Sequence, residues 1–167
     1  RAGGPPGRGG AGAGRGQAAG GFGLLAGAGA VVAVGSGDGV VELFARRGVQ
    51  GVVTGGQTLN PSTAELLSSV EAVNASQVIV LPNNKNIIPV AEQVDGQTAK
   101  NVFVVPTRGI AEGFASLLAY DPEAAGIDNA KAMVGAAEHV VAGEITQAGR
   151  DSSCGLRPIH EGGWLGP

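Results

Sequence analysis

Two short apolar runs constrain the fold of this chain most, because each stops abruptly and is followed by a helical pattern. The first is V-V-T at 52–54, which runs into G-G-Q-T-L-N-P-S before A-E-L-L begins a helix. The second is V-I-V-L at 78–81, which ends at P-N-N-K-N. Apolar strands that alternate with helices are typical of a parallel sheet, and the loops at its carboxyl edge commonly carry the function.

The strand–loop–helix unit occurs four times, at intervals of about 20 to 26 residues. The strand runs are apolar on both faces, as a parallel sheet covered by helices requires. The expected strands are 31–34, 52–54, 78–81 and 102–105, and the expected helices are 40–47, a helix from Pro61 onward, 86–93, 109–119 and 128–141. We therefore predict a three-layer, doubly wound α/β domain with a mainly parallel sheet of four core strands and a C-terminal antiparallel ribbon.

The start of the chain differs in composition from the rest. The first thirty residues hold 13 of the 31 glycines and three arginines, but no acidic residue. Such a segment buries too little apolar surface to offset the entropy of ordering, so we predict that 1–29 is disordered and that 30–167 forms the domain. A basic arm for RNA or an anionic surface is the alternative to a linker. The missing initiating methionine and a C-terminus just after Trp164-Leu165 suggest a fragment truncated at its end.

Charge and cysteine content exclude several classes of protein. Beyond residue 30, eight basic residues stand against fourteen acidic ones, and such an acidic surface argues against a nucleic-acid-binding protein. The single cysteine, Cys154, excludes a disulfide within the chain and favours a reducing compartment, which we take to be the cytoplasm. No apolar run is long enough to span a membrane, and the first residues lack the pattern of a signal peptide.

Polar residues follow each strand, and the carboxyl ends of parallel strands meet at one edge of a sheet. The candidate binding residues in these loops are Gln57, Thr58, Asn60, Asn83, Asn84, Lys85, Asn86, Thr107 and Arg108. Helix N-termini favour anions, and Lys85 and Arg108 add charge, so the edge could hold an anion, a carboxylate or a polar partner surface. The alternative is that several of the loop side chains only cap helices: Asp38, Asn60, Ser62, Asn84 and Asn86. For Ser62 the spacing to Glu65 is that of a capping box.

No motif points to catalysis or to a metal site. G-S-G-D-G at 35–39 does not match the dinucleotide fingerprint, and a P-loop is absent. His139, Cys154 and His160 lack the close spacing of zinc ligands, and neither Cys154 nor Ser36 has a base placed by a motif. The aspartates are scattered rather than clustered, which makes this chain alone a poor candidate for phosphoryl transfer. We therefore expect no catalytic residue, no metal and no cofactor in this chain.

Specific loop motifs carry a family resemblance. V-V-T-G-G-Q-T-L-N-P-S-T-A-E-L-L and V-I-V-L-P-N-N-K-N-I-I closely resemble the C-terminal, DegV-like domain of the bacterial fatty acid kinase A subunit, of the dihydroxyacetone-kinase-like family. V-A-V-G-S-G-D-G, N-V-F-V-V-P-T, G-E-I-T-Q-A-G-R-D-S and E-G-G-W-L-G agree with it. The resemblance covers about residues 30–166.

The resemblance implies a role in lipid metabolism. It implies a parent protein with three parts: an N-terminal kinase domain that binds ATP and Mg, a middle domain and a C-terminal domain to which this chain corresponds. The implied partners are a fatty-acid-binding B subunit of the DegV family, which presents the acyl carboxylate for phosphorylation, and the missing kinase domain of the same polypeptide. The resemblance does not decide whether the parent protein forms a homodimer. The zinc associated with the middle domain is not carried over to Cys154 and His160.

We expect this chain to be a non-catalytic domain that docks the B subunit through the loops at the carboxyl edge. One alternative is a small anionic ligand held at the same edge by Lys85 and Arg108. Another is a scaffold that only orders the missing kinase domains, which an exposed apolar surface along the open sheet edge would favour.

Overall fold

The structure is a computed structural model that describes residues 29–55, 60–141, 143, 146–147, 152–154 and 157–165 of the chain. The segment predicted to be disordered lies outside these residues, apart from Gly29. All four core strands and five helices fall within them.

A four-stranded, all-parallel sheet forms the centre, with the strand order β2-β1-β3-β4. The strands are β1 (Ala30–Val34), β2 (Gly51–Val53), β3 (Gln77–Leu81) and β4 (Asn101–Val104). Each lies within one residue of its predicted position, so the parallel sheet is confirmed. The chain moves from β1 outward to β2, and then crosses to β3 and β4 on the other side. Between β1 and β3 the winding therefore reverses direction, and in doubly wound sheets ligands bind at such a switch point.

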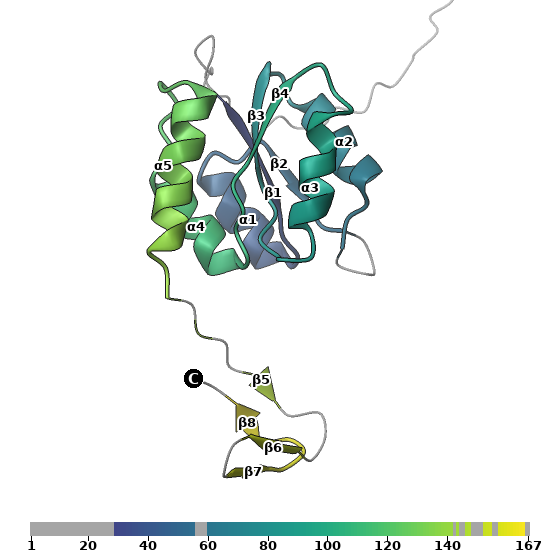
Figure 1. Cartoon of the computed structure of the whole chain (residues 1–167), viewed down its shortest axis with the longest axis vertical. Helices are drawn as coiled ribbons and strands as arrows, with labels where there is room; N and C mark the ends of the chain where they lie inside the picture. The colour runs from purple at the N-terminus through teal and green to yellow at the C-terminus, as the bar shows by residue number, and fades with distance from the viewer. Residues whose placement is uncertain are drawn as a thin grey trace, which may run out of the picture.

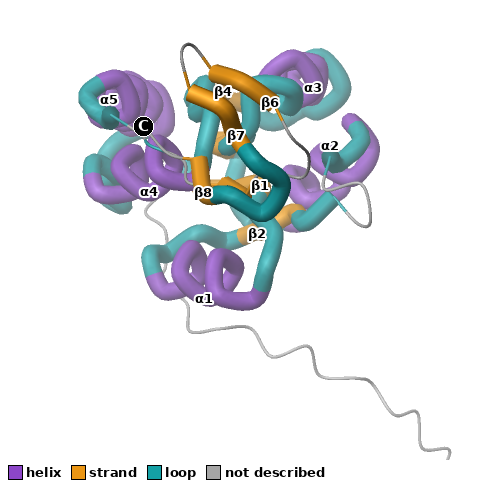
Figure 2. Tube along the Cα trace, turned by 90° about the horizontal axis from the view of Figure 1, so that it is seen from below, coloured by secondary structure: helices purple, strands orange, loops and turns teal. Residues whose placement is uncertain are grey.

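Helices cover both faces of the sheet, which confirms the three-layer, doubly wound architecture (Figures 1 and 2). One face is covered by α1 (Asp38–Arg46), α4 (Ile110–Leu118) and α5 (Gly126–Glu138), and the other by α2 (Thr63–Ala72) and α3 (Ile88–Asp95). Alternate residues of a strand point to opposite faces, so Val31 packs with Phe44 and Met133, while Val32 packs with Leu66. Burial of each such side chain contributes about 1.5–3 kcal/mol.

Each helix begins within two residues of its predicted start. The third helix begins at Ile88 rather than at 86, because 84–87 form a turn in which the amide of Ile87 donates to the carbonyl oxygen of Asn84 (3.0 Å). Pro89 then occupies the first turn, where its missing N–H costs no helical hydrogen bond. The first helix begins at Asp38, two residues before the predicted start.

The C-terminal strands form two separate antiparallel pairs. β5 (Thr146–Gln147) pairs with β8 (Trp164–Leu165), and β6 (Ser152–Cys154) pairs with β7 (Arg157–Ile159). A turn separates β7 from β8 in the sequence. In this turn Gly162 has a positive φ, and the amide of Gly163 donates to the carbonyl oxygen of His160. Among the described residues, the single continuous ribbon predicted from the sequence is therefore not seen. These strands lie beyond the end of α5, apart from the parallel sheet (Figure 1).

The helices of the described part of the chain are short. None of them is long and apolar enough to cross a bilayer.

Candidate functional site

The loops after β1, β3 and β4 meet at the carboxyl edge of the sheet, the lower edge in Figure 1. The end of β2 lies at the same edge, where the amide of Gly35 donates to the carbonyl oxygen of Val53 (3.0 Å). The predicted convergence is thus seen for the described loops. Gln57 and Thr58, two of the candidate binding residues, lie outside the described residues. Asn60 is exposed beside them.

Asn83 connects three strands at this edge. Its side-chain amide nitrogen donates to the carbonyl oxygen of Val34 at the end of β1 (2.8 Å). Its side-chain oxygen accepts from the hydroxyl of Thr107 after β4 (2.8 Å), and its backbone amide donates to the same hydroxyl (3.0 Å). Asn83 is only 8% exposed and Thr107 is fully buried. These two candidate residues therefore have their polar atoms committed inside the protein.

The backbone and the neighbouring helix hold Asn83 in one conformation. Its φ of 53° is in the left-handed region, which asparagine adopts more readily than most residues. Gly113 of α4 lies against its side chain, so closely that a Cβ at position 113 would fall 2.0 Å from the Asn83 side-chain oxygen. A fourth element, α4, therefore closes the switch point over Asn83.

The loop that follows Asn83 presents a cation that no described residue pairs. The side-chain oxygen of Asn84 accepts from the amide of Asn86 (2.9 Å), which closes a local turn two residues on. Lys85 and Asn86 are exposed, and the Lys85 ammonium has no hydrogen bond or ion pair with any described residue. Asn84 thus stabilises its own loop, and neither Asn84 nor Asn86 caps α3, whose N-cap residue is Ile87.

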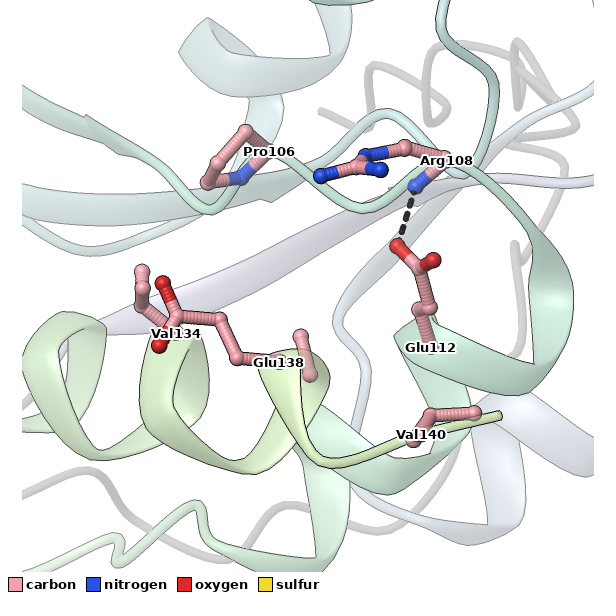
Figure 3. A pocket seen from close by; sticks show the side chains of 7 residues that line it. Pro106, Arg108, Glu112, Val134, Glu138 and Val140 are labelled. Atoms are coloured by element: carbon pink, nitrogen blue, oxygen red, sulfur yellow. Dashed lines mark hydrogen bonds between the residues drawn. The ribbon is translucent and has the colours of Figure 1, made fainter. Parts of the chain in front are cut away.

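Arg108 borders a small pocket of about 150 Å³ between α4 and α5. Pro106 and Val140 line it, and the carboxylates of Glu112 and Glu138 face it from the two helices (Figure 3). The backbone amide of Arg108 donates to Glu112 (2.7 Å), whereas its guanidinium makes no bond with a described residue. The pocket therefore carries more negative than positive charge.

One of the predicted helix caps is confirmed in full. Ser62 accepts a hydrogen bond from the amide of Glu65, and the Glu65 carboxylate accepts one from the amide of Ser62. Two hydrogen bonds to the Glu65 carboxylate lower its pKa. The larger effect comes from the Ser62 backbone amide and the smaller from the Ser62 hydroxyl. Asp38, a cap only in the alternative interpretation of the loop side chains, is the first residue of α1, and Gly37 is the N-cap.

Metal-ligating side chains are dispersed in the part of the chain that the structure describes. No three His, Cys, Asp or Glu residues gather there closely enough to hold a metal ion. His139 ends α5, with its Nδ1 2.6 Å from the carbonyl oxygen of Gly135, and His160 lies in the C-terminal turn.

Comparison with known proteins identifies the family. A family model for the C-terminal domain of FakA-like proteins, those similar to the A subunit of fatty acid kinase, matches residues 30–167. The match includes the whole sheet and its carboxyl-edge loops. The chain belongs to this family. The resemblance inferred from the two loop motifs is thereby confirmed.

Relatives of this FakA-like domain occur in several bacteria. Protein YloV of Bacillus subtilis is 37% identical over 136 residues, which cover 81% of this chain and 25% of that protein. An uncharacterized protein of Staphylococcus haemolyticus is 37% identical over 137 residues, 82% of this chain and 25% of its own length. One of Staphylococcus aureus is 32% identical with the same coverage. The chain thus spans about a quarter of the length of these curated relatives.

Sequence reasoning missed the acidic side of the edge. Glu112 lies four residues after Arg108, in the first turn of α4, and its carboxylate accepts from the Arg108 backbone amide just before that helix. That short spacing was a usable signal. Glu138 comes from a different helix thirty residues later, and only the packing of α5 against α4 brings it to Arg108.

Proposed function

We propose that this chain is the docking domain of a cytoplasmic fatty acid kinase A subunit and that its carboxyl-edge loops bind the fatty-acid-binding B subunit. In this proposal, the B subunit presents the acyl carboxylate, and phosphoryl transfer from ATP with Mg takes place in a kinase domain that belongs to the rest of the parent protein. The observation that carries the proposal is the loop 84–86, with Lys85 and Asn86 exposed, in a domain of this family. It offers an ammonium that no described residue pairs, between two amides, at the edge where doubly wound sheets bind their ligands.

The chemistry of the loop suits a protein surface. Lys85 is flanked by Asn84 and Asn86, which offer donors and acceptors without charge. An exposed cation beside neutral amides steers a partner electrostatically and fixes its orientation through short polar contacts. Amides of this kind are adaptable hydrogen-bonding groups, as in the binding surfaces of antibodies.

A small anion at the same edge is less well supported. Arg108 was expected to supply charge to such a ligand, but Glu112 and Glu138 face the pocket that it borders. A bound anion would meet two carboxylates for one guanidinium, and like charges disfavour binding. Thermal stabilisation of the isolated chain by a fatty acid or by inorganic phosphate, without any protein partner, would favour this alternative.

The test is calorimetric titration of the chain with a purified B subunit that carries a bound fatty acid. The double variant Asn84→Ala, Lys85→Ala should bind about tenfold more weakly or worse, because it removes charge-assisted contacts. The matched control is Asn74→Ala, Lys131→Ala, which removes an exposed amide and an exposed lysine elsewhere on the domain. Equal affinities of the two double variants would remove loop 84–86 from the interface.

A second candidate function, a scaffold for the kinase domain, is favoured by an apolar groove along the open edge of β4. Val102, Phe103 and Val104 line it together with Ile127 of α5, which is 48% exposed. Apolar surface of this kind marks contacts with other protein segments. In the full-length parent protein, Ile127→Asp should then lower kinase activity while the affinity for the B subunit stays unchanged.

A further inference from the structure

We propose that Asn83 is the positioning residue of the docking loop and that it holds Lys85 where the ammonium can meet a carboxylate of the partner. This inference rests on the proposed function, because it assigns a role to a residue behind the same surface. Asn83 itself is buried and does not touch the partner.

The first step is that both polar atoms of the Asn83 side chain have a hydrogen-bond partner inside the protein. Its amide nitrogen bonds to β1, and its oxygen bonds to the hydroxyl that follows β4. A buried polar group that loses its partner costs more free energy than the average hydrogen bond gains, so the side chain has one stable position. Asn83 therefore links the loop to two strands that are not its sequence neighbours.

The second step is the anchoring of the loop at both ends. Asn83 begins it in the left-handed conformation, and Ile87, only 2% exposed, ends it in the core. Between them, the Asn84 side chain and carbonyl accept from the amides of Asn86 and Ile87. Since Lys85 lies between the two anchors, the backbone direction that Asn83 sets decides where the ammonium points.

The third step is the charge that the loop leaves uncompensated. From Asn83 to Ala91 the sequence N-N-K-N-I-I-P-V-A holds one cation and no acid. The Lys85 ammonium also has no acceptor among the described residues of other elements. A carboxylate on the partner is the group that completes such a site, and a loop held rigid loses less entropy when it binds.

The experiment measures the free chain first, so that it does not depend on the B subunit. Amide hydrogen exchange is followed in the wild type, Thr107→Val, Thr107→Ser and Asn83→Asp. Thr107→Val removes the hydroxyl that bonds to Asn83, whereas Thr107→Ser keeps a hydroxyl at that position. Asn83→Asp removes the side-chain amide that donates to the carbonyl oxygen of Val34 in β1. Thr98→Val serves as the matched control, because Thr98 also donates a hydrogen bond, to Glu71, but lies before β4 at the opposite edge.

We expect Thr107→Val and Asn83→Asp to raise the exchange rate of the Ile87 amide about tenfold and that of the Ala91 amide in α3 much less. Thr107→Ser should restore the wild-type rate, and Thr98→Val should leave Ile87 unchanged. An equal rise at Ile87 and Ala91, or no rise at Ile87, would overturn the proposal, because Asn83 would then act on global stability or not at all.

Titration with the fatty-acid-loaded B subunit, well below the melting temperature of each variant, completes the test. Thr107→Val should bind about tenfold more weakly, with a smaller dependence of affinity on salt, and Thr107→Ser should bind like the wild type. A loosened loop with unchanged affinity would overturn the role of Asn83 in docking. Failure of the wild type itself to bind would instead overturn the proposed function, and the exchange data would distinguish the two results.

Discussion

The side-chain oxygen of Asn83 occupies the space into which any side chain at position 113 would extend. A Cβ on Gly113 would lie 2.0 Å from that oxygen and 2.7 Å from the amide carbon. α4 can approach the switch point this closely only because residue 113 is glycine. The contact places a helix over a hydrogen-bonded polar cluster at the point where doubly wound folds bind their ligands.

Gly113→Ala should therefore destabilise the domain by about 1–3 kcal/mol, because Asn83 or α4 must shift and break the hydrogen bonds at the switch point. Gly135→Ala is the matched control, since a Cβ there meets nothing within 4 Å. That substitution should stabilise α5 by about 0.4–1 kcal/mol. Urea unfolding of both variants measures the difference, and equal free energies of unfolding would contradict the close contact.

Lys100 caps the C-terminus of α2. Its ammonium donates to the carbonyl oxygens of Val70 (2.7 Å), Glu71 (3.0 Å) and Val73 (2.5 Å), where the helix dipole is negative. Lys100→Met keeps the length of the side chain but should lower the free energy of unfolding by about 1.5 kcal/mol or more. Lys131→Met, at an exposed lysine of α5, should change it by less than about 0.5 kcal/mol. A similar loss in both variants would show that the three bonds do not stabilise the domain.

The capping box at Ser62 makes stability depend on pH. Hydrogen bonds from Ser62 lower the pKa of Glu65 below its ordinary value of 4.5, so the unfolded chain binds a proton at a higher pH than the folded chain. The stability that the Glu65 carboxylate contributes is present above pH 4.5 and is lost as the pH falls through the lowered pKa. Glu65→Gln should thus be less stable than the wild type at pH 7, and this difference should shrink on acidification. A difference that stays constant down to about pH 3 would contradict this linkage.

Ser62→Ala tests the other half of the capping box, the hydrogen bond from the Glu65 amide to the Ser62 hydroxyl. It should cost about 1 kcal/mol at pH 7, because it leaves the amide of Glu65 without its acceptor. Ser68→Ala, at an exposed position inside the same helix, is the control and should be neutral or slightly stabilising. Thermal unfolding followed by circular dichroism compares the two, and an equal melting temperature would exclude a capping contribution.

The single tyrosine allows a direct titration. Burial, as the largest cause, raises the pKa of Tyr120 above 10.0, and its hydroxyl donates to the carbonyl oxygen of Gly29 (2.9 Å). The absorbance of the phenolate at 295 nm should therefore rise with a midpoint above that value. Since the folded pKa is the higher one, stability is full below pH 10 and falls as the pH rises further. A midpoint at or below 10 would show that water reaches the phenol freely.

The strands and their order of appearance could be predicted because they depend on local sequence. Val31 to Val34 and Val78 to Leu81 are short, continuous apolar runs, which are typical of a parallel sheet covered on both faces. The short crossovers then require parallel neighbours. Ser62 and Glu65 could also be paired from the sequence, because both partners of a capping box lie within one helical turn.

The division of the polar loop residues into buried and exposed could not be predicted. Asn83 and Lys85 are two residues apart in one polar loop, yet the first is 8% exposed and the second is exposed to solvent. That difference depends on α4, which begins 27 residues after Asn83 and brings Gly113 over it. The prediction of the C-terminal ribbon was wrong for a related reason, because the local sequence does not reveal that a turn precedes β8 and that β5 pairs with β8 while β6 pairs with β7.

By itself, the sequence determined the layers of this protein and the edge at which its loops meet. Both follow from the spacing of apolar residues and from the short connections, which involve residues close together in the chain. Only the tertiary structure decided which of the polar side chains at that edge hold the fold together and which are free to bind. Their burial depends on contacts between elements that are far apart in sequence, and no local pattern records such contacts.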